Sequence, residues 1–168
     1  MLTHHRKPIC LSLVALDLPV WSVVETAATV YEKTPNQFHV LLTEPIMQGD
    51  RAFSHPLTQP FQTDETSFRP HSPRLLWLEI SPYRVIMTMQ GNGISSYRHY
   101  WEQGVYGISR YWLQDPDLPQ NGQLRLRNYT RSLLLFNNPT PQHLRIEYEL
   151  WAENLQMGRY VLDLEIQH

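Results

Sequence analysis

Hydrophobic and polar positions alternate with a period of two over most of the chain, and this alternation predicts β-strands. In residues 144–152, for example, apolar Leu144, Ile146 and Tyr148 alternate with charged neighbours. Short turns are expected between the last three strands, so residues 123–168 should form an antiparallel three-strand meander. The same alternation, or a short apolar run, predicts further strands at residues 9–16, 38–43, 75–80, 83–89, 94–101, 105–113, 124–136 and 159–166.

Residues 19–33 interrupt this pattern, because their apolar side chains recur at the spacing of an α-helix. Pro19 would lie in the first turn of such a helix, and Pro35 would end it. These elements together predict an α+β fold that is predominantly antiparallel β, with an N-terminal strand–helix–strand unit followed by the meander. A lipocalin-like barrel that carries one helix is the alternative arrangement.

The chain of 168 residues has the length of one compact domain, and we expect a single domain over residues 1–168. Residues 44–73 differ from the rest, because they contain five prolines and no sustained periodicity. A segment of this length without regular structure is usually functional or disordered. Phe53, Phe61 and Phe68 give it apolar surface to bury, so we expect an ordered Pro-rich loop or flap that lies against the body of the domain.

Arginine carries almost all of the positive charge. Twelve of the fourteen basic residues are Arg, and only Lys7 and Lys33 are Lys. Arginine favours planar, bidentate and stacking contacts over loosely solvated point charges. The formal net charge is −2, so the strongly basic surface of a dedicated nucleic-acid-binding protein is missing, and we expect no nucleic-acid partner.

Cys10 is the only cysteine, so no internal disulfide can form and a reducing compartment, the cytoplasm, is expected. No apolar stretch approaches the roughly eighteen residues that a membrane span needs, and we expect none. The eight histidines show no metal-ligand spacing, and no phosphate-binding or nucleophile-elbow motif is present. We therefore predict no metal site and no cofactor, assign no catalytic residue, and favour a binding protein over an enzyme.

The last strand pair predicts a charged outer face, because burying the even-numbered residues places the odd-numbered residues outside. A turn centred on Gln156 sets Glu153 opposite Arg159. The same register also creates two acidic pairs, Glu149–Asp163 and Glu147–Glu165. Like charges directly opposite one another are destabilising, so basic residues are expected beside these pairs.

Arginines of the preceding strand are placed to neutralise these carboxylates. A turn near Thr140 brings Arg131 to Glu149 and Arg127 to Glu153. The carboxylates could serve metal binding or acid–base chemistry, or they could belong to a solvated salt-bridge lattice. We favour the lattice, because the balancing arginines follow from the same register. Its predicted members are Arg127, Arg131, Glu149, Glu153 and Arg159.

Residues 97–112 are dense in tyrosine, tryptophan and arginine. Aromatic rings beside guanidinium groups can form a platform for a flat ligand, a nucleobase or the hot-spot side chains of a protein partner. In the alternative interpretation, alternation along strands buries every second residue in the core. The candidate binding residues are Tyr97, Arg98, Tyr100, Trp101, Arg110, Tyr111 and Trp112.

One short phrase points to a known family, and it reads Leu124-Arg125-Leu126-Arg127 followed by Arg131-Ser132. With this phrase, its size and its arginine and aromatic content, the chain resembles the S-type phycobiliprotein chromophore lyases. These lyases are lipocalin-like barrels that handle bilins. The resemblance therefore implies a tetrapyrrole ligand held by arginine and aromatic residues.

Three functions follow from these observations. The leading hypothesis is a non-enzymatic binding or assembly protein that holds a protein partner on the aromatic and arginine-rich segment 97–112. The alternative is a small-ligand carrier or chromophore-lyase-like barrel with a tetrapyrrole as its ligand, and the third is an enzyme of unrecognised type. A carrier needs an interior left open by its inward residues, whereas a binding protein needs an exposed aromatic patch.

Overall fold

The computed structural model describes residues 5–17, 21–43, 74–90, 95–113 and 122–167, and ten antiparallel strands lie within these ranges. Each strand pairs with its neighbours in sequence, and β1 pairs with both β2 and β10, so the sheet closes into a barrel. The flap expected over residues 44–73 lies outside the described residues. The strands are β1 (His5–Ala15), β2 (Trp21–Thr34), β3 (Gln37–Thr43), β4 (Leu75–Ile80), β5 (Arg84–Gln90), β6 (Ser95–Glu102), β7 (Tyr106–Leu113), β8 (Gln123–Asn137), β9 (Pro141–Ala152) and β10 (Leu155–Ile166).

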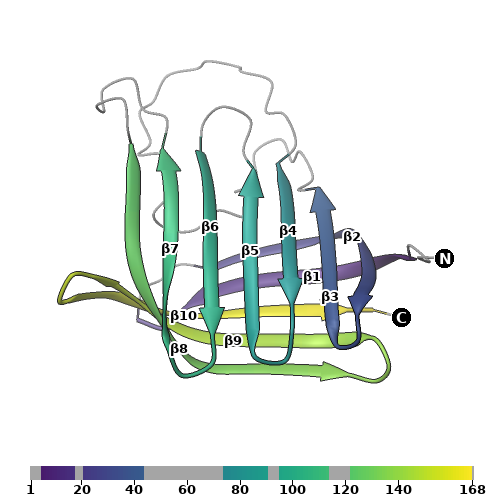
Figure 1. Cartoon of the computed structure of the whole chain (residues 1–168). Coiled ribbons are helices and arrows are strands. Elements are labelled where there is room, and N and C mark those ends of the chain that lie inside the picture. The colour runs from purple at the N-terminus through teal and green to yellow at the C-terminus, as the bar shows by residue number, and fades with distance from the viewer. Residues whose placement is uncertain (1–4, 18–20, 44–73, 91–94, 114–121, 168) are drawn as a thin grey trace, which may run out of the picture.

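The barrel has two layers that cross each other (Figure 1). Strands β3 to β7 stand side by side in one layer, and β1, β9 and β10 run across behind them. The long strands β2 and β8 belong to both layers, because β2 pairs with β1 and β3, while β8 pairs with β7 and β9. The outside of the barrel therefore has two broad faces, and β8 contributes to both.

A β-bulge between Thr130 and Ser132 lies where β8 leaves β7 and continues along β9 alone. The bulge changes the parity of the strand, since Thr130 is buried before it and Leu133 after it. Gln103 bridges the interrupted ladder: its Oε1 accepts a hydrogen bond from the Leu133 N–H at 2.6 Å, and its Nε2 donates to the Arg131 carbonyl at 3.4 Å. One side chain thus satisfies two backbone groups of β8 that lie beyond Tyr129, where pairing with β7 ends.

Side chains of one parity on each strand face the interior and form the hydrophobic core. The confirmed expectation is a β-rich, antiparallel chain in which alternation decides what is buried. Between β6 and β10 the interior is occupied mainly by large rings. Five aromatic side chains there are at most 2% exposed, namely Tyr97, Trp101, Tyr111, Tyr148 and Tyr160.

The α+β prediction is wrong, because the segment expected as a helix over residues 19–33 forms strand β2. Inward-facing Val24 and Ala28 are four residues apart, so they fit one face of a helix as well as one face of a strand. Many of their neighbours are β-branched, which favours a strand. Pairing decides the outcome, since a helix here would leave β1 and β3 without a partner and open the barrel.

No helix among the described residues is long and apolar enough to cross a membrane.

The register expected for the last strand pair is also wrong, by four residues. The connection between β9 and β10 is the two-residue turn Glu153–Asn154, with Glu153 in a left-handed conformation (φ 54°), rather than a turn centred on Gln156. Arg159 therefore lies opposite Glu149. Both registers bury the even-numbered residues, so parity could not distinguish them. The predicted acidic pairs are replaced by the mixed pairs Asp163–Arg145 and Glu165–His143.

Candidate functional site

The segment 97–112 contributes to two different environments, because strands β6 and β7 alternate between the inside and the outside of the barrel. Three of the seven candidate residues have no exposed surface and belong to the core. These are Tyr97, Trp101 and Tyr111. The other four lie on the outer face, exposed or half-buried, and they are Arg98, Tyr100, Arg110 and Trp112.

A polar network lies among the inward aromatic rings. His99 stacks on Trp101 with ring centroids 4.8 Å apart, and its Nδ1 lies 2.7 Å from the Ser109 hydroxyl oxygen. Asn128 Nδ2 donates to the same hydroxyl oxygen at 2.8 Å, so Ser109 on β7 links His99 on β6 to Asn128 on β8. Burial lowers the pKa of His99 to about 3, and the imidazole is therefore neutral at pH 7.

The Ser109–His99 pair is not arranged for nucleophilic catalysis, because both side chains are fully buried and a substrate has no surface from which to reach them. Three further atoms of this interior, Trp101 Nε1, Asn128 Oδ1 and Thr130 Oγ1, are buried without a hydrogen-bond partner among the described residues. Most buried polar atoms in proteins have a partner. These three atoms are therefore exceptions within an interior that large rings fill.

Sequence analysis missed this network, although a signal for it was present. His99, Ser109 and Asn128 each stand at a position where the strand alternation calls for an inward apolar side chain. A polar residue at such a position needs a partner from a neighbouring strand. Among the described residues, no group of three His, Cys, Asp or Glu side chains is placed to hold a metal ion.

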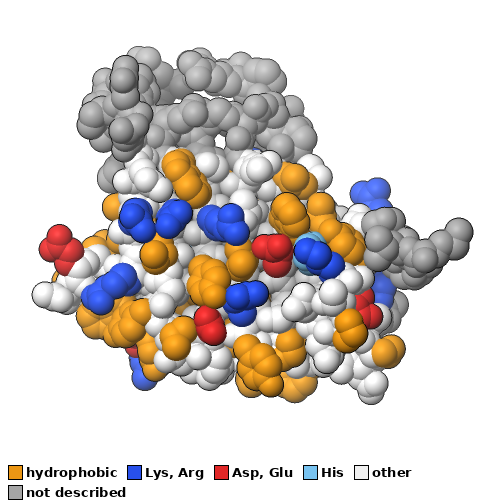
Figure 2. Space-filling view, in the orientation of Figure 1, with side chains coloured by type: hydrophobic (Ala, Val, Ile, Leu, Met, Phe, Trp, Pro, Cys, Tyr) orange, Lys and Arg blue, Asp and Glu red, His pale blue; other side chains and the backbone are white. Residues whose placement is uncertain are grey.

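Three arginines form a row across the outer face of β6, β7 and β8. Arg98 lies directly opposite Arg110, and Arg110 lies directly opposite Arg125. Figure 2 shows Lys and Arg side chains gathered over these strands. No hydrogen bond, ion pair or ring contact joins any of the three to a described residue. We call Arg98, Arg110 and Arg125 the arginine row, and the outer surface of β6–β8 the arginine-row face.

Large apolar side chains border the arginine row. Ile108 and Trp112 flank Arg110 on β7, and each is 38% exposed. Tyr100 on β6 is half-buried. Trp77 on β4 is 39% exposed and lies in line with the arginine row, because it is opposite Thr88 of β5, which is opposite Arg98. Arginine, tryptophan and tyrosine are the residues most enriched among the hot spots of protein interfaces.

The arginines of the C-terminal strands are paired instead. Arg131 Nη1 lies 2.6 Å from Glu149 Oε1, and Arg145 Nη1 lies 2.9 Å from Asp163 Oδ2. His143 Nε2 lies 2.8 Å from the other carboxylate oxygen of Asp163. Sequence analysis did not place Arg145 beside Asp163, because its register was shifted. We call these five residues, on the outer surface of β8–β10, the lattice face.

Two of the expected lattice contacts take a different form. Arg127 Nη2 donates to the backbone carbonyl of Glu153 at 2.5 Å, rather than to its carboxylate. The same guanidinium lies over the Tyr106 ring, 5.2 Å from its centroid. Arg159 lies opposite Glu149, rather than opposite Glu153. Arg127 is thus held by a carbonyl and an aromatic ring, which leaves the carboxylate of Glu153 out of this contact.

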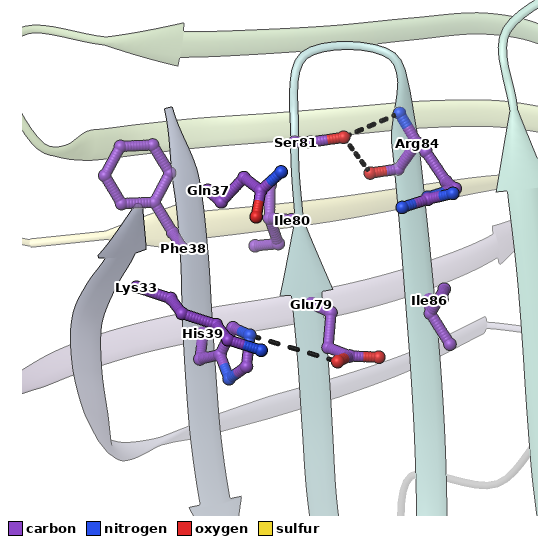
Figure 3. A pocket seen from close by; sticks show the side chains of 9 residues that line it. All are labelled: Lys33, Gln37, Phe38, His39, Glu79, Ile80, Ser81, Arg84 and Ile86. Carbon is purple, nitrogen blue, oxygen red and sulfur yellow. Dashed lines mark hydrogen bonds and ion pairs between the residues drawn. The ribbon is translucent and has the colours of Figure 1, made fainter. Parts of the chain in front are cut away.

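A shallow cleft of about 150 Å³ lies on the outer face of β3, β4 and β5 (Figure 3). His39 lies in it, with Nδ1 2.9 Å from the Tyr31 hydroxyl and Nε2 3.9 Å from Glu79 Oε1. Burial lowers the pKa of His39. The Glu79 carboxylate acts in the opposite direction and raises the pKa, whereas the Lys33 ammonium lowers it further. Pockets for organic ligands are usually about 300–1,000 Å³, so this cleft has room only for a very small molecule. Sequence analysis gave no signal for it, because its residues come from separate strands.

Comparison with known proteins defines the class of fold. The chain is similar to a solved structure, the ywiB protein from Bacillus subtilis, with a TM-score of 0.55 and 15% sequence identity. The similarity covers 97% of this chain and 94% of that chain. No family model matches the chain, and no curated protein matches it. At this identity the likeness shows the barrel fold alone, and function has to be argued from the surfaces of this chain.

Proposed function

We propose that this barrel is a binding protein that holds an acidic protein partner on the arginine-row face. The observation that carries the proposal is the direct opposition of Arg98, Arg110 and Arg125, to none of which a described residue binds a carboxylate. Like charges directly opposite on neighbouring strands destabilise a sheet, by roughly 0.2–1 kcal/mol for each pair. Carboxylates from a partner would remove that repulsion and gain charge-assisted hydrogen bonds.

The neighbours of the row favour a protein over a nucleic acid. Ile108 and Trp112 offer apolar contact on either side of Arg110, as the centre of a protein interface does. A nucleic-acid site usually needs a wider basic field, whereas this chain has a net charge of −2. The Glu102 carboxylate also lies on the same outer face, where it accepts a hydrogen bond from the Tyr100 hydroxyl at 3.1 Å.

The test is a titration of a fluorescein-labelled, glutamate-rich peptide with the full chain, followed by fluorescence anisotropy. We expect saturable binding to the parent chain, with an affinity that falls as salt is raised. In Arg110→Glu the affinity should be at least about tenfold lower. The matched control is Arg6→Glu, which makes the same charge change at an exposed site on β1 and should leave affinity within about twofold.

Two results would contradict the proposal. An equal loss in Arg6→Glu would show that the peptide responds to overall charge and not to the arginine row. Tighter binding of single-stranded DNA than of the acidic peptide, with the same dependence on Arg110, would assign the surface to nucleic acid instead.

A small-ligand carrier is the second candidate, favoured by the closed barrel and by the buried, unpartnered atoms Trp101 Nε1, Asn128 Oδ1 and Thr130 Oγ1. Biliverdin serves as the tetrapyrrole probe. A shift in its absorbance that is lost in Asn128→Leu and kept in Arg110→Glu would favour the carrier. The absence of any shift on mixing would contradict it.

A further inference from the structure

We infer that the segment taken by the arginine-row face is an acidic α-helix lying across strands β6, β7 and β8. This inference rests on the proposed function and adds the conformation of the bound segment and its orientation across the strands. The relevant geometry is the spacing of the three guanidinium-bearing residues, which the sheet itself sets. Each lies on a different strand, directly opposite the next.

The spacing of the row matches carboxylates on a helix. Neighbouring strands lie about 4.8 Å apart, so Arg98 and Arg125 are separated by about 9.6 Å across the sheet. A helix rises about 1.5 Å per residue, so residues i and i+7 are about 10.5 Å apart on one face, with i+3 or i+4 midway between them. Glutamates at i, i+4 and i+7 would therefore meet Arg98, Arg110 and Arg125 in turn.

An extended segment fits the same row less well. Same-face side chains of a strand are about 6.7 Å apart, so the third carboxylate would lie about 13 Å from the first and overshoot the row by about 4 Å. An extended peptide commonly gains affinity by adding a strand to a free sheet edge. At Arg98 and Arg110 the sheet offers no such edge, because β6 is paired with β5 and β7 there, and β7 is paired with β6 and β8.

The side chains next to the row set how the helix would lie. Ile108 and Trp112 stand on opposite sides of Arg110 along β7, so apolar residues on both flanks of the acidic stripe would be in contact. Glu102 lies four residues beyond Arg98 on β6, about 13 Å away along the strand. The partner's carboxylates would thus be drawn to the Arg98 end of β6 and repelled from the Glu102 end.

The experiment compares two alanine-based peptides of identical composition, both held helical by a staple on the far side. One carries glutamate at i, i+4 and i+7, which form one stripe on the helix. The other carries glutamate at i, i+5 and i+10, which point to different sides of the helix. We expect the striped peptide to bind the full chain at least about tenfold more tightly, and we expect Arg110→Glu but not Arg6→Glu to abolish the difference. A striped peptide broken by a central proline should bind as weakly as the dispersed one.

The outcomes separate this inference from the proposed function. Equal binding of the striped, dispersed and proline-broken peptides, with each lost in Arg110→Glu, would overturn the helix and leave the acidic-partner proposal standing. Binding that does not depend on Arg110 for any peptide would overturn both. Folding of the variant is checked by its melting temperature, which should not fall, because replacing the central arginine of the row by glutamate turns two repulsive pairs into attractive ones.

Discussion

The arginine-row face and the lattice face are built from the same residue type and differ in what lies opposite it. On the lattice face, the β9–β10 register places Arg145 opposite Asp163, and the two groups form an ion pair at 2.9 Å. On the arginine-row face, the register places Arg110 between two other arginines. Strand register therefore decides whether a surface arginine is occupied within the fold or available to a partner.

Both faces carry exposed apolar side chains, so the faces differ in the partners of their charges. Ile108 and Trp112 flank the arginine row, and Leu134 and Phe136 lie beside the ion pairs of the lattice face. Exposed ion pairs contribute only about 0–1 kcal/mol each to folding. Neither face should dominate stability, and the buried residues between them should.

The largest predicted effect therefore comes from the interior. Burial holds the pKa of His99 at about 3, against about 6.5 in an unfolded chain, so the unfolded state binds more protons between these values. Stability contributed by the neutral imidazole is present above about pH 6.5 and is lost as pH falls toward 3, by up to about 5 kcal/mol. Urea unfolding from pH 7 to pH 4 should show this slope.

Two variants isolate the source of that slope. His99→Phe should flatten the dependence of unfolding free energy on pH, whereas Ser109→Ala should lower stability and keep the slope, because His99 stays buried. The same slope in His99→Phe as in the parent chain would show that another group controls acid unfolding.

The next effect concerns the bulge in β8, which lies at the boundary between the two faces. Gln103→Ala should lower the free energy of unfolding by about 2 kcal/mol, because it leaves the Leu133 N–H and the Arg131 carbonyl without their bridge. Gln156→Ala, at an exposed site beside the register shift between Gln156 and Gly158 in β10, is the control and should change stability by less than about 0.5 kcal/mol. Equal effects in denaturant melts would contradict this role of Gln103.

A smaller effect separates the two faces directly. Asp163→Asn should destabilise the chain by about 1 kcal/mol, because it weakens the contacts with both Arg145 and His143. Arg110→Gln should leave stability unchanged or raise it slightly, because it removes a charge that lies between two arginines and binds no carboxylate of a described residue. Thermal melts at low and high salt measure both, and a loss in Arg110→Gln as large as that in Asp163→Asn would break the comparison.

The smallest predicted effect is that of Arg131→Lys. The substitution keeps the charge beside Glu149 but loses the planar donor geometry of the guanidinium, so a loss of a few tenths of a kcal/mol is expected. A double-mutant cycle with Glu149→Gln measures the coupling. An equal coupling free energy to Glu149 in the parent chain and in Arg131→Lys would show that the guanidinium geometry has no part in this pair.

Much of the fold could be predicted from period-two alternation, which located nine of the strands. The helix expected over residues 19–33 was wrong, because Val24 and Ala28 suit either structure and only the closure of the barrel selects the strand. Alternation also told which residues share a face. It could not give the register between strands, since a shift by an even number of residues keeps the same side chains inside.

The arginine row was beyond sequence reasoning for the same reason. Alternation places Arg98, Arg110 and Arg125 on the outside, but their direct opposition depends on two registers that parity alone leaves open. The interior network was within reach, because a buried strand position occupied by histidine, serine or asparagine is itself a signal. The lattice face lay between these cases: residue types were informative, but the pairing of Asp163 required the turn at Glu153–Asn154.

The most direct test of the account is a map of backbone amide chemical shifts during titration with the striped acidic peptide. The account predicts that the shifts that move belong to residues 96–112 and 123–127, around Arg98, Arg110 and Arg125, and that those of residues 143–149 and 159–165 on the lattice face stay fixed. Movement confined to the lattice face, or spread evenly over both faces, would contradict it.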